Sequence, residues 1–161
     1  MDKGNKGFFA NLLLVAAMAG FGAAHGADTG PIAAPKTSVA ERIDVARLAI
    51  KNKDWKKALA ELGIALRDEP RNADIHNLLG YSYRKQANPN LPKAFEHYNT
   101  AIRLDARHKG AHEYIGEAYL MDKKPQEAEK HLLALEKICG NTSCEEYADL
   151  AKAIADYKAK N

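Results

Sequence analysis

Between residues 39 and 158, apolar residues recur at the three- and four-residue spacing that gives a helix one apolar face. One such stripe comprises Ile75, Leu78, Leu79, Ser82 and Tyr83. After a short turn, a second stripe comprises Ala94, Phe95, Tyr98, Ala101 and Ile102. An apolar face on a helix needs a partner, so the pattern predicts helices that pack in pairs.

The helix pair is repeated along the chain. One copy contains Leu79-Gly80-x-x-Tyr83, and the next contains Ile115-Gly116-x-x-Tyr119. The small residues of the second helices, Ala58, Ala94 and Ala128, are 36 and 34 residues apart, and the earliest copy is the faintest. A period of this length is typical of stacked helical repeats.

These motifs resemble the tetratricopeptide repeat, whose signature combines an aromatic residue, a Leu-Gly pair, a Tyr, a small Ala, a Phe and a closing Pro. The resemblance covers residues 39–140. His76 and His112 stand where the family usually has Trp, and Ala106 and Gly140 replace the closing Pro.

The resemblance implies an all-α fold, a right-handed α-solenoid of about three helix pairs. The repeats are expected at 39–72, 73–108 and 109–142, followed by a capping helix over 143–158. A stack of repeats exposes an apolar face at its end, and a cap with a polar outer side covers it.

Several residues are expected to pack the repeats together. They are Leu79, Gly80, Tyr83, Ala94, Tyr98, Gly116, Tyr119 and Ala128. Glycine inside a helix costs about 1 kcal/mol relative to Ala, so close helix packing is the reason we expect for both glycines. The spacing from Gly80 to Ala94 exceeds its counterparts by two residues, which predicts a longer turn within residues 86–91.

Residues 1–26 have the layout of a secretory signal peptide. Lys3 and Lys6 precede an apolar run over residues 8–24, and small residues lie before a break at Ala27. We expect cleavage near this point, a flexible linker over residues 27–38, and a periplasmic or secreted location. An uncleaved leader is the alternative, and it would be the chain's only contact with a membrane.

Charge and motifs argue against several functions. The formal net charge is +3, from 24 basic and 21 acidic residues, and a balance so near neutral argues against nucleic acid as the main partner. The sequence has no His-Glu-x-x-His motif, phosphate-binding loop or nucleophile elbow. We therefore expect no catalytic residues, no cofactor and no metal, and a protein that is not an enzyme.

The histidines follow the repeat. His76 matches His112, and His97 matches His131, one copy later. A group that returns at the same place in each copy favours a packing role over a catalytic one.

Cys139 and Cys144 are the only cysteines. They bracket the turn before the last helix, and an exported protein meets an oxidising compartment, so we expect a structural disulfide. A loop this short contributes about 2 kcal/mol in the chain-entropy model. A thiol-redox protein that uses this pair is an alternative, although the spacing is not Cys-x-x-Cys.

The resemblance also implies where a partner binds, because in the family the first helix of each repeat lines a concave groove. The corresponding positions are Asn77, Tyr81, Arg84, Lys85, Glu113, Glu117, Leu120 and Met121. Weaker candidates from the first repeat are Arg47, Ile50 and Lys51.

The function implied is that of an exported scaffold or adaptor that binds a peptide or helix of another protein. Arg84 and Lys85 are expected to meet acidic groups of the partner, and Glu113 and Glu117, on an exposed helix, to meet basic ones. A self-associating structural module of the cell envelope is an alternative, and the oligomeric state stays open.

Overall fold

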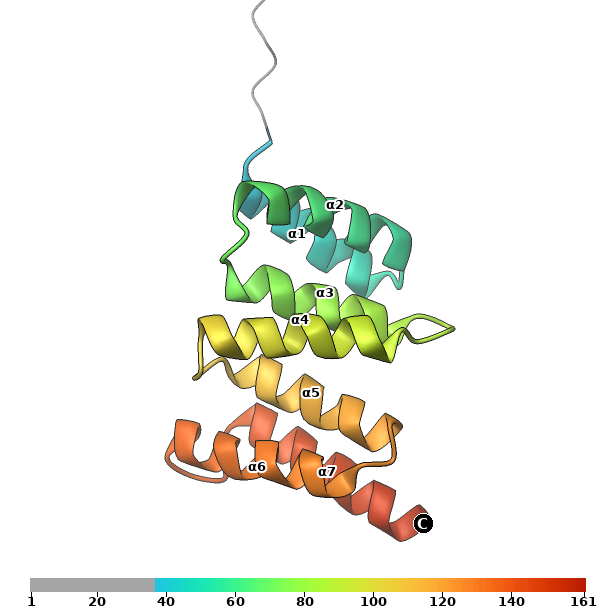
Figure 1. Cartoon of the computed structure of the whole chain (residues 1–161), viewed down its shortest axis with the longest axis vertical. Helices are drawn as coiled ribbons and strands as arrows, with labels where there is room; N and C mark the ends of the chain where they lie inside the picture. The colour runs from blue at the N-terminus through green and yellow to red at the C-terminus, as the bar shows by residue number, and fades with distance from the viewer. Residues whose placement is uncertain (1–36) are drawn as a thin grey trace, which may run out of the picture. The chain divides into compact units, whose positions relative to one another are not determined.

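The computed structural model describes residues 37–161. The expected signal peptide, 1–26, and nearly all of the expected linker, 27–38, lie outside the described residues. The described part is entirely helical (Figure 1) and has these helices: α1 Val39–Lys51, α2 Trp55–Asp68, α3 Ala73–Lys85, α4 Leu91–Leu104, α5 Lys109–Met121, α6 Pro125–Cys139 and α7 Glu145–Lys160. The prediction of an all-α fold is confirmed.

The helix ends are fixed by local sequence. Ser38 and Glu41 form a capping box at the start of α1. Asn72 accepts a hydrogen bond from the Ile75 backbone N–H at the start of α3. Pro125 begins α6, where its missing N–H costs nothing. Local residues therefore set where these three helices begin.

The helices form two layers, with α1, α3, α5 and α7 in one and α2, α4 and α6 in the other (Figure 1). Successive helices of the first layer contact one another, whereas α2 does not contact α4 and α4 does not contact α6. The first layer is therefore the more tightly curved, inner side of the stack. This arrangement is the predicted right-handed α-solenoid of three helix pairs with a capping helix.

Apolar clusters lie at each step of the stack. Leu62 of α2 packs with Ile75 of α3, and Tyr98 of α4 packs with Ile115 of α5. Leu135 of α6 packs with residues of α7. Each helix pair therefore buries its apolar face on the next element of the stack.

The two motif glycines permit close contacts, as expected, but with different neighbours. A Cβ on Gly80 would lie 2.6 Å from the ring of Tyr98 in α4. A Cβ on Gly116 would lie 2.7 Å from Leu150, which belongs to α7 rather than to α6. The cap therefore occupies the place that the first helix of a fourth repeat would take.

Some boundaries differ from the prediction. The capping helix covers residues 145–160 instead of 143–158, because Cys144 is its N-cap. The turn between α3 and α4 spans residues 86–90, against 52–54 and 122–124 in the other pairs, which confirms the two-residue insertion. Among the described helices, none has the length and apolarity needed to cross a bilayer.

Candidate functional site

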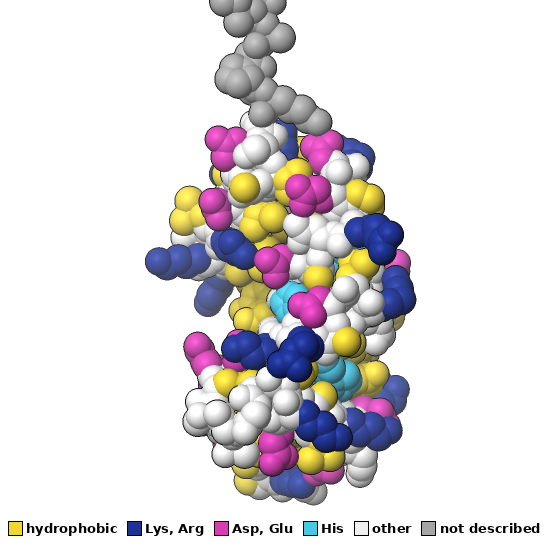
Figure 2. Space-filling view, turned by 90° about the vertical axis from the view of Figure 1, so that its left-hand side faces the viewer, with side chains coloured by type: hydrophobic (Ala, Val, Ile, Leu, Met, Phe, Trp, Pro, Cys, Tyr) yellow, Lys and Arg dark blue, Asp and Glu magenta, His cyan; other side chains and the backbone are white. Residues whose placement is uncertain are grey.

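The predicted groove residues all lie on α3 and α5, in the inner layer, but they are not equally accessible. Lys85 and Met121 are exposed, and Tyr81 and Glu117 are half-buried. The buried members of the set are Asn77, Arg84, Glu113 and Leu120. Figure 2 shows the surface indented midway along one edge of the described part, below a group of Lys and Arg side chains. The floor of the groove therefore contains the buried polar side chains of this set, together with the half-buried Tyr81.

Arg84 is at the centre of this floor. Its side chain is 4% exposed, and its Nη1 lies 2.5 Å from Glu117 Oε2 on the neighbouring helix α5. Its Nε donates to the Tyr98 hydroxyl at 3.2 Å, and its Nη2 is buried without a partner. Arg84 was expected to meet acidic groups of a partner, but in the free protein its guanidinium is buried and already joins α3, α4 and α5.

Aromatic rings surround this guanidinium. The Arg84 Cζ lies 5.4 Å from the ring centroid of Tyr81 and 5.6 Å from that of Tyr114. The rings of Tyr81 and Tyr114 are 4.9 Å apart, and Trp55 lies 6.4 Å from Tyr81. Tyr81 is half-buried, and Lys85 Nζ lies over its ring at 5.8 Å from the centroid, so the ring stands beside an exposed positive charge.

Glu113 differs from its prediction more than any other groove residue. We expected it on an exposed helix face, but its side chain is buried because α7 packs on α5 beside it. Burial raises the pKa of Glu113 to about 8, and the negative charges of Glu117, Asp149 and Glu146 add to the shift. The carboxyl group is therefore mostly neutral at pH 7.

Charge is unevenly distributed along the inner layer. Lys51 and Lys85 are exposed near the N-terminal end of the groove, whereas Glu113, Glu146 and Asp149 gather between α5 and α7. Of the weaker candidates, Arg47 lies 3.9 Å from Asp74 in α3, and Ile50 is half-buried. The groove is basic at one end and acidic at the other.

The histidines form two equivalent pairs within the repeats. The Nδ1 atoms of His76 and His97 are 3.1 Å apart, and those of His112 and His131 are 3.0 Å apart. His76 Nε2 lies 3.1 Å from the Pro70 carbonyl oxygen, so this nitrogen carries the proton and His76 Nδ1 accepts from His97.

Each pair also has an aromatic neighbour. The Tyr83 ring stacks on His97, and the Tyr119 ring stacks on His131. The histidines thus join the two helices of a repeat, as their matching positions suggested. Leu79, Ala94 and Ala128 are buried between helices, which is where the packing prediction placed them.

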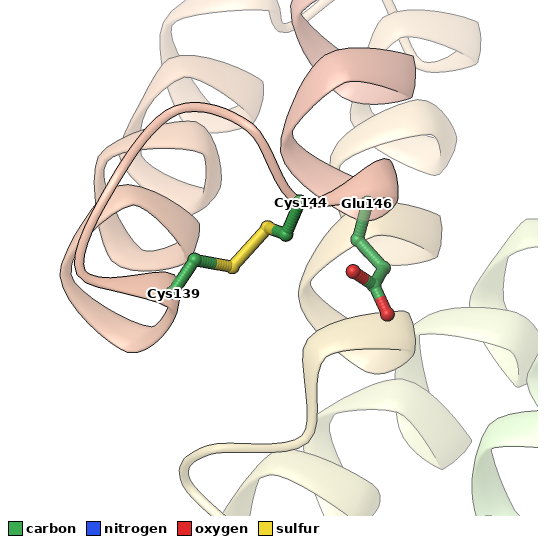
Figure 3. Close-up of side chains that lie close together, drawn as sticks. All are labelled: Cys139, Cys144 and Glu146. Carbon is green, nitrogen blue, oxygen red and sulfur yellow. A yellow bond between two sulfur atoms is a disulfide. The ribbon is translucent and has the colours of Figure 1, made fainter.

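Cys139 and Cys144 form the expected disulfide, with an S–S distance of 2.07 Å (Figure 3). Within the described residues, these two sulfur atoms and a Glu146 oxygen are the one group of three with metal-ligand spacing. The bonded sulfurs are not thiolates, and Glu146 is paired with Lys109 Nζ at 3.3 Å. This group does not fit a metal site in the oxidised protein.

Sequence reasoning missed three contributors to the groove. Tyr114, Glu146 and Asp149 were not among the groove residues expected from the sequence. The repeat period was the signal that could have found Glu146, because α7 continues the 36-residue step. Asn77 corresponds to Glu113 one step later, and Gly110 corresponds to Glu146 in the same way.

A profile of the tetratricopeptide repeat family matches residues 44–108 and 87–141, which is more than half of the chain. The chain belongs to this family. No curated protein matches the sequence.

Several solved structures share the fold. The TPR2B domain of yeast Sti1, in a complex with pHsp70, has a TM-score of 0.68 at 15% identity, covering 76% of this chain and 98% of that one. The first TPR of Spaghetti (RPAP3), bound to the HSP90 peptide SRMEEVD, has a TM-score of 0.66 at 16% identity, and the match covers 76% of this chain and 96% of that one. The Yersinia enterocolitica translocator chaperone SycD has a TM-score of 0.67 at 14% identity, and the match covers 76% of this chain and 92% of that one.

Proposed function

We propose that this protein is an exported scaffold or adaptor that binds a peptide or helical segment of another protein in the groove of its inner layer. The observation that carries this proposal is the aromatic floor made by Tyr81 and Tyr114 around the buried Arg84. Aromatic residues in a partly enclosed site supply most of the binding energy in many protein interfaces.

The similar structures support this proposal by analogy of fold. One of them is in a complex with pHsp70, one is bound to an HSP90 peptide, and one is a type III secretion translocator chaperone. Export is supported by the sequence of the leader alone, and a periplasmic location would bring the groove to proteins of the bacterial envelope.

The groove also predicts the chemistry of the bound segment. Lys51 and Lys85 favour acidic residues at one end of the segment, and the carboxyl groups between α5 and α7 favour basic residues at the other. Complementary charges of this kind set the orientation and the association rate more than the affinity.

Site-specific photocrosslinking in intact cells tests the proposal. A benzophenone amino acid replaces Lys85 or Met121 in the groove, or Glu96 or Lys137 on the outer-layer helices as controls. We expect a partner protein to be crosslinked from the groove positions only. Equal crosslinking from both layers would contradict the proposal.

A matched pair of variants then examines the groove chemistry. Tyr81→Ala combined with Lys85→Glu should abolish the crosslink from Met121, whereas Lys137→Glu should leave it unchanged. Arg84 is unsuitable for this purpose, because its removal would disturb the contact between α3 and α5 as well as the groove.

A further inference from the structure

Two neighbouring positions of the inner layer have neutral residues in one repeat and glutamates in the next. In the second repeat, Asn77 lies beside Gly110, and a Cβ on Gly110 would come within 3.2 Å of Asn77 Nδ2. Thirty-six residues later, the same two positions are Glu113 and Glu146. The neutral contact of one repeat is replaced by two carboxyl groups in the next.

Glu113 has no partner within the described part of the chain. Its side chain is 7% exposed, yet no hydrogen bond or ion pair with a described residue reaches it. Its oxygens are not among the fully enclosed unpartnered atoms, so they keep contact with the solvent of the groove. A buried acid without a partner is costly to folding, and such groups are common at binding sites.

The groups that face Glu113 come from three helices. On α5 itself they are Tyr114 and Glu117, on α7 they are Glu146 and Asp149, and on α3 the group is Arg84. Arg84 is paired with Glu117, and Lys109 is paired with Glu146. Asp149 is exposed and has no pair with a described residue, so the local charge around Glu113 is negative.

We propose that the part of the groove between α5 and α7 binds an ammonium or guanidinium group, with Glu113 and Asp149 as its carboxylate ligands. This inference rests on the proposed function, because the cation is a Lys or Arg side chain of the bound segment. The cation supplies the hydrogen-bond donors and the positive charge that Glu113 lacks in the free protein.

Binding of the cation is coupled to loss of a proton. The pKa of Glu113 is about 8, mainly through burial and then through its negative neighbours, so the free group is mostly protonated at pH 7. Only the ionised form pairs with a cation. The affinity for a permanently charged cation should therefore rise about tenfold between pH 7 and pH 9, as the ionised fraction rises.

The test uses methylguanidinium chloride as the probe and the full chain labelled with nitrogen-15 for NMR. Titration at constant ionic strength should give saturable shifts confined to residues 110–117 and 146–153. Sodium and magnesium chloride should not reproduce them. Glu113→Gln should weaken binding about tenfold, because the charge-assisted hydrogen bonds are lost, whereas Glu96→Gln on α4 should change it less than twofold.

The possible outcomes separate this inference from the proposed function. Absence of saturable shifts, equal binding to Glu113→Gln, or equal effects of magnesium would overturn the cation site, even where groove crosslinking succeeds. Saturable binding that depends on Glu113 would support the site, even where no partner is crosslinked. A melting temperature for Glu113→Gln at or above that of the natural chain verifies that the variant is folded.

Discussion

Arg84 Nη1 on α3 lies 2.5 Å from Glu117 Oε2 on α5, and this pair spans two repeats. The guanidinium is almost fully buried, with its Nε held by the Tyr98 hydroxyl. The pair therefore fixes the angle between successive inner helices as well as the shape of the groove floor.

Replacing Arg84 with Ala should destabilise the protein by about 3 kcal/mol, because Glu117 and the Tyr98 hydroxyl lose their partner in a buried site. Urea unfolding monitored by circular dichroism measures the change. Arg103→Ala, which removes an exposed arginine from α4, should cost less than about 0.5 kcal/mol. Similar losses for the two variants would show that the pair does not hold the repeats together.

The helices of the described part were predictable because helix spacing and capping are local. The period placed each pair, and Asn72 and Pro125 marked the starts of α3 and α6. The contact between Arg84 and Glu117 was not predictable in the same way. It depends on how far α5 is shifted along α3, and the spacing within one helix contains no information about that shift.

The glycine contacts lead to a prediction with an internal control. Gly80→Ala should destabilise the protein by about 1–3 kcal/mol, because the new Cβ would lie 2.6 Å from the Tyr98 ring and outweigh the gain in helix propensity. Gly63→Ala, with no atom within 4 Å of the new Cβ, should instead stabilise by up to about 1 kcal/mol. Thermal unfolding of both variants measures the difference, and the same sign for both would refute the close-packing explanation.

The histidine pairs predict that acid destabilises the fold. Burial lowers the pKa of His131 to about 4, and the neighbouring His112 contributes; burial and His76 lower the pKa of His97 in the same way. Since these folded-state pKa values lie below the unfolded value near 6.5, the stabilisation is fully present above about pH 6.5 and is lost as the pH falls. Allowing for the partial exposure of the rings, we expect a loss of about 1 kcal/mol from the His112–His131 pair between pH 7 and pH 5, and a loss in the same direction from the His76–His97 pair.

Unfolding in urea at a series of pH values measures this loss. The measurement uses a Glu113→Gln background, because the raised pKa of Glu113 would itself increase stability as the pH falls over the same range. His97→Phe combined with His131→Phe keeps an aromatic ring on Tyr83 and Tyr119 but removes the titrating group, so its stability should vary less between pH 7 and pH 5. An unchanged pH dependence in this double variant would assign the acid sensitivity to other groups.

The disulfide gives the last prediction, which also separates two functions. Cys139→Ser combined with Cys144→Ser should lower the free energy of unfolding by about 2 kcal/mol, because the short closed loop no longer restricts the unfolded chain. Amide exchange should accelerate mainly in α7, which the bridge fastens to α6. Ser143→Ala in the same turn is the matched control and should leave both measurements nearly unchanged.

At a temperature where the double variant is folded, a scaffold should still be crosslinked to its partner, since the cysteines lie outside the groove. Loss of the crosslink from the folded double variant would favour thiol exchange as the function of this pair.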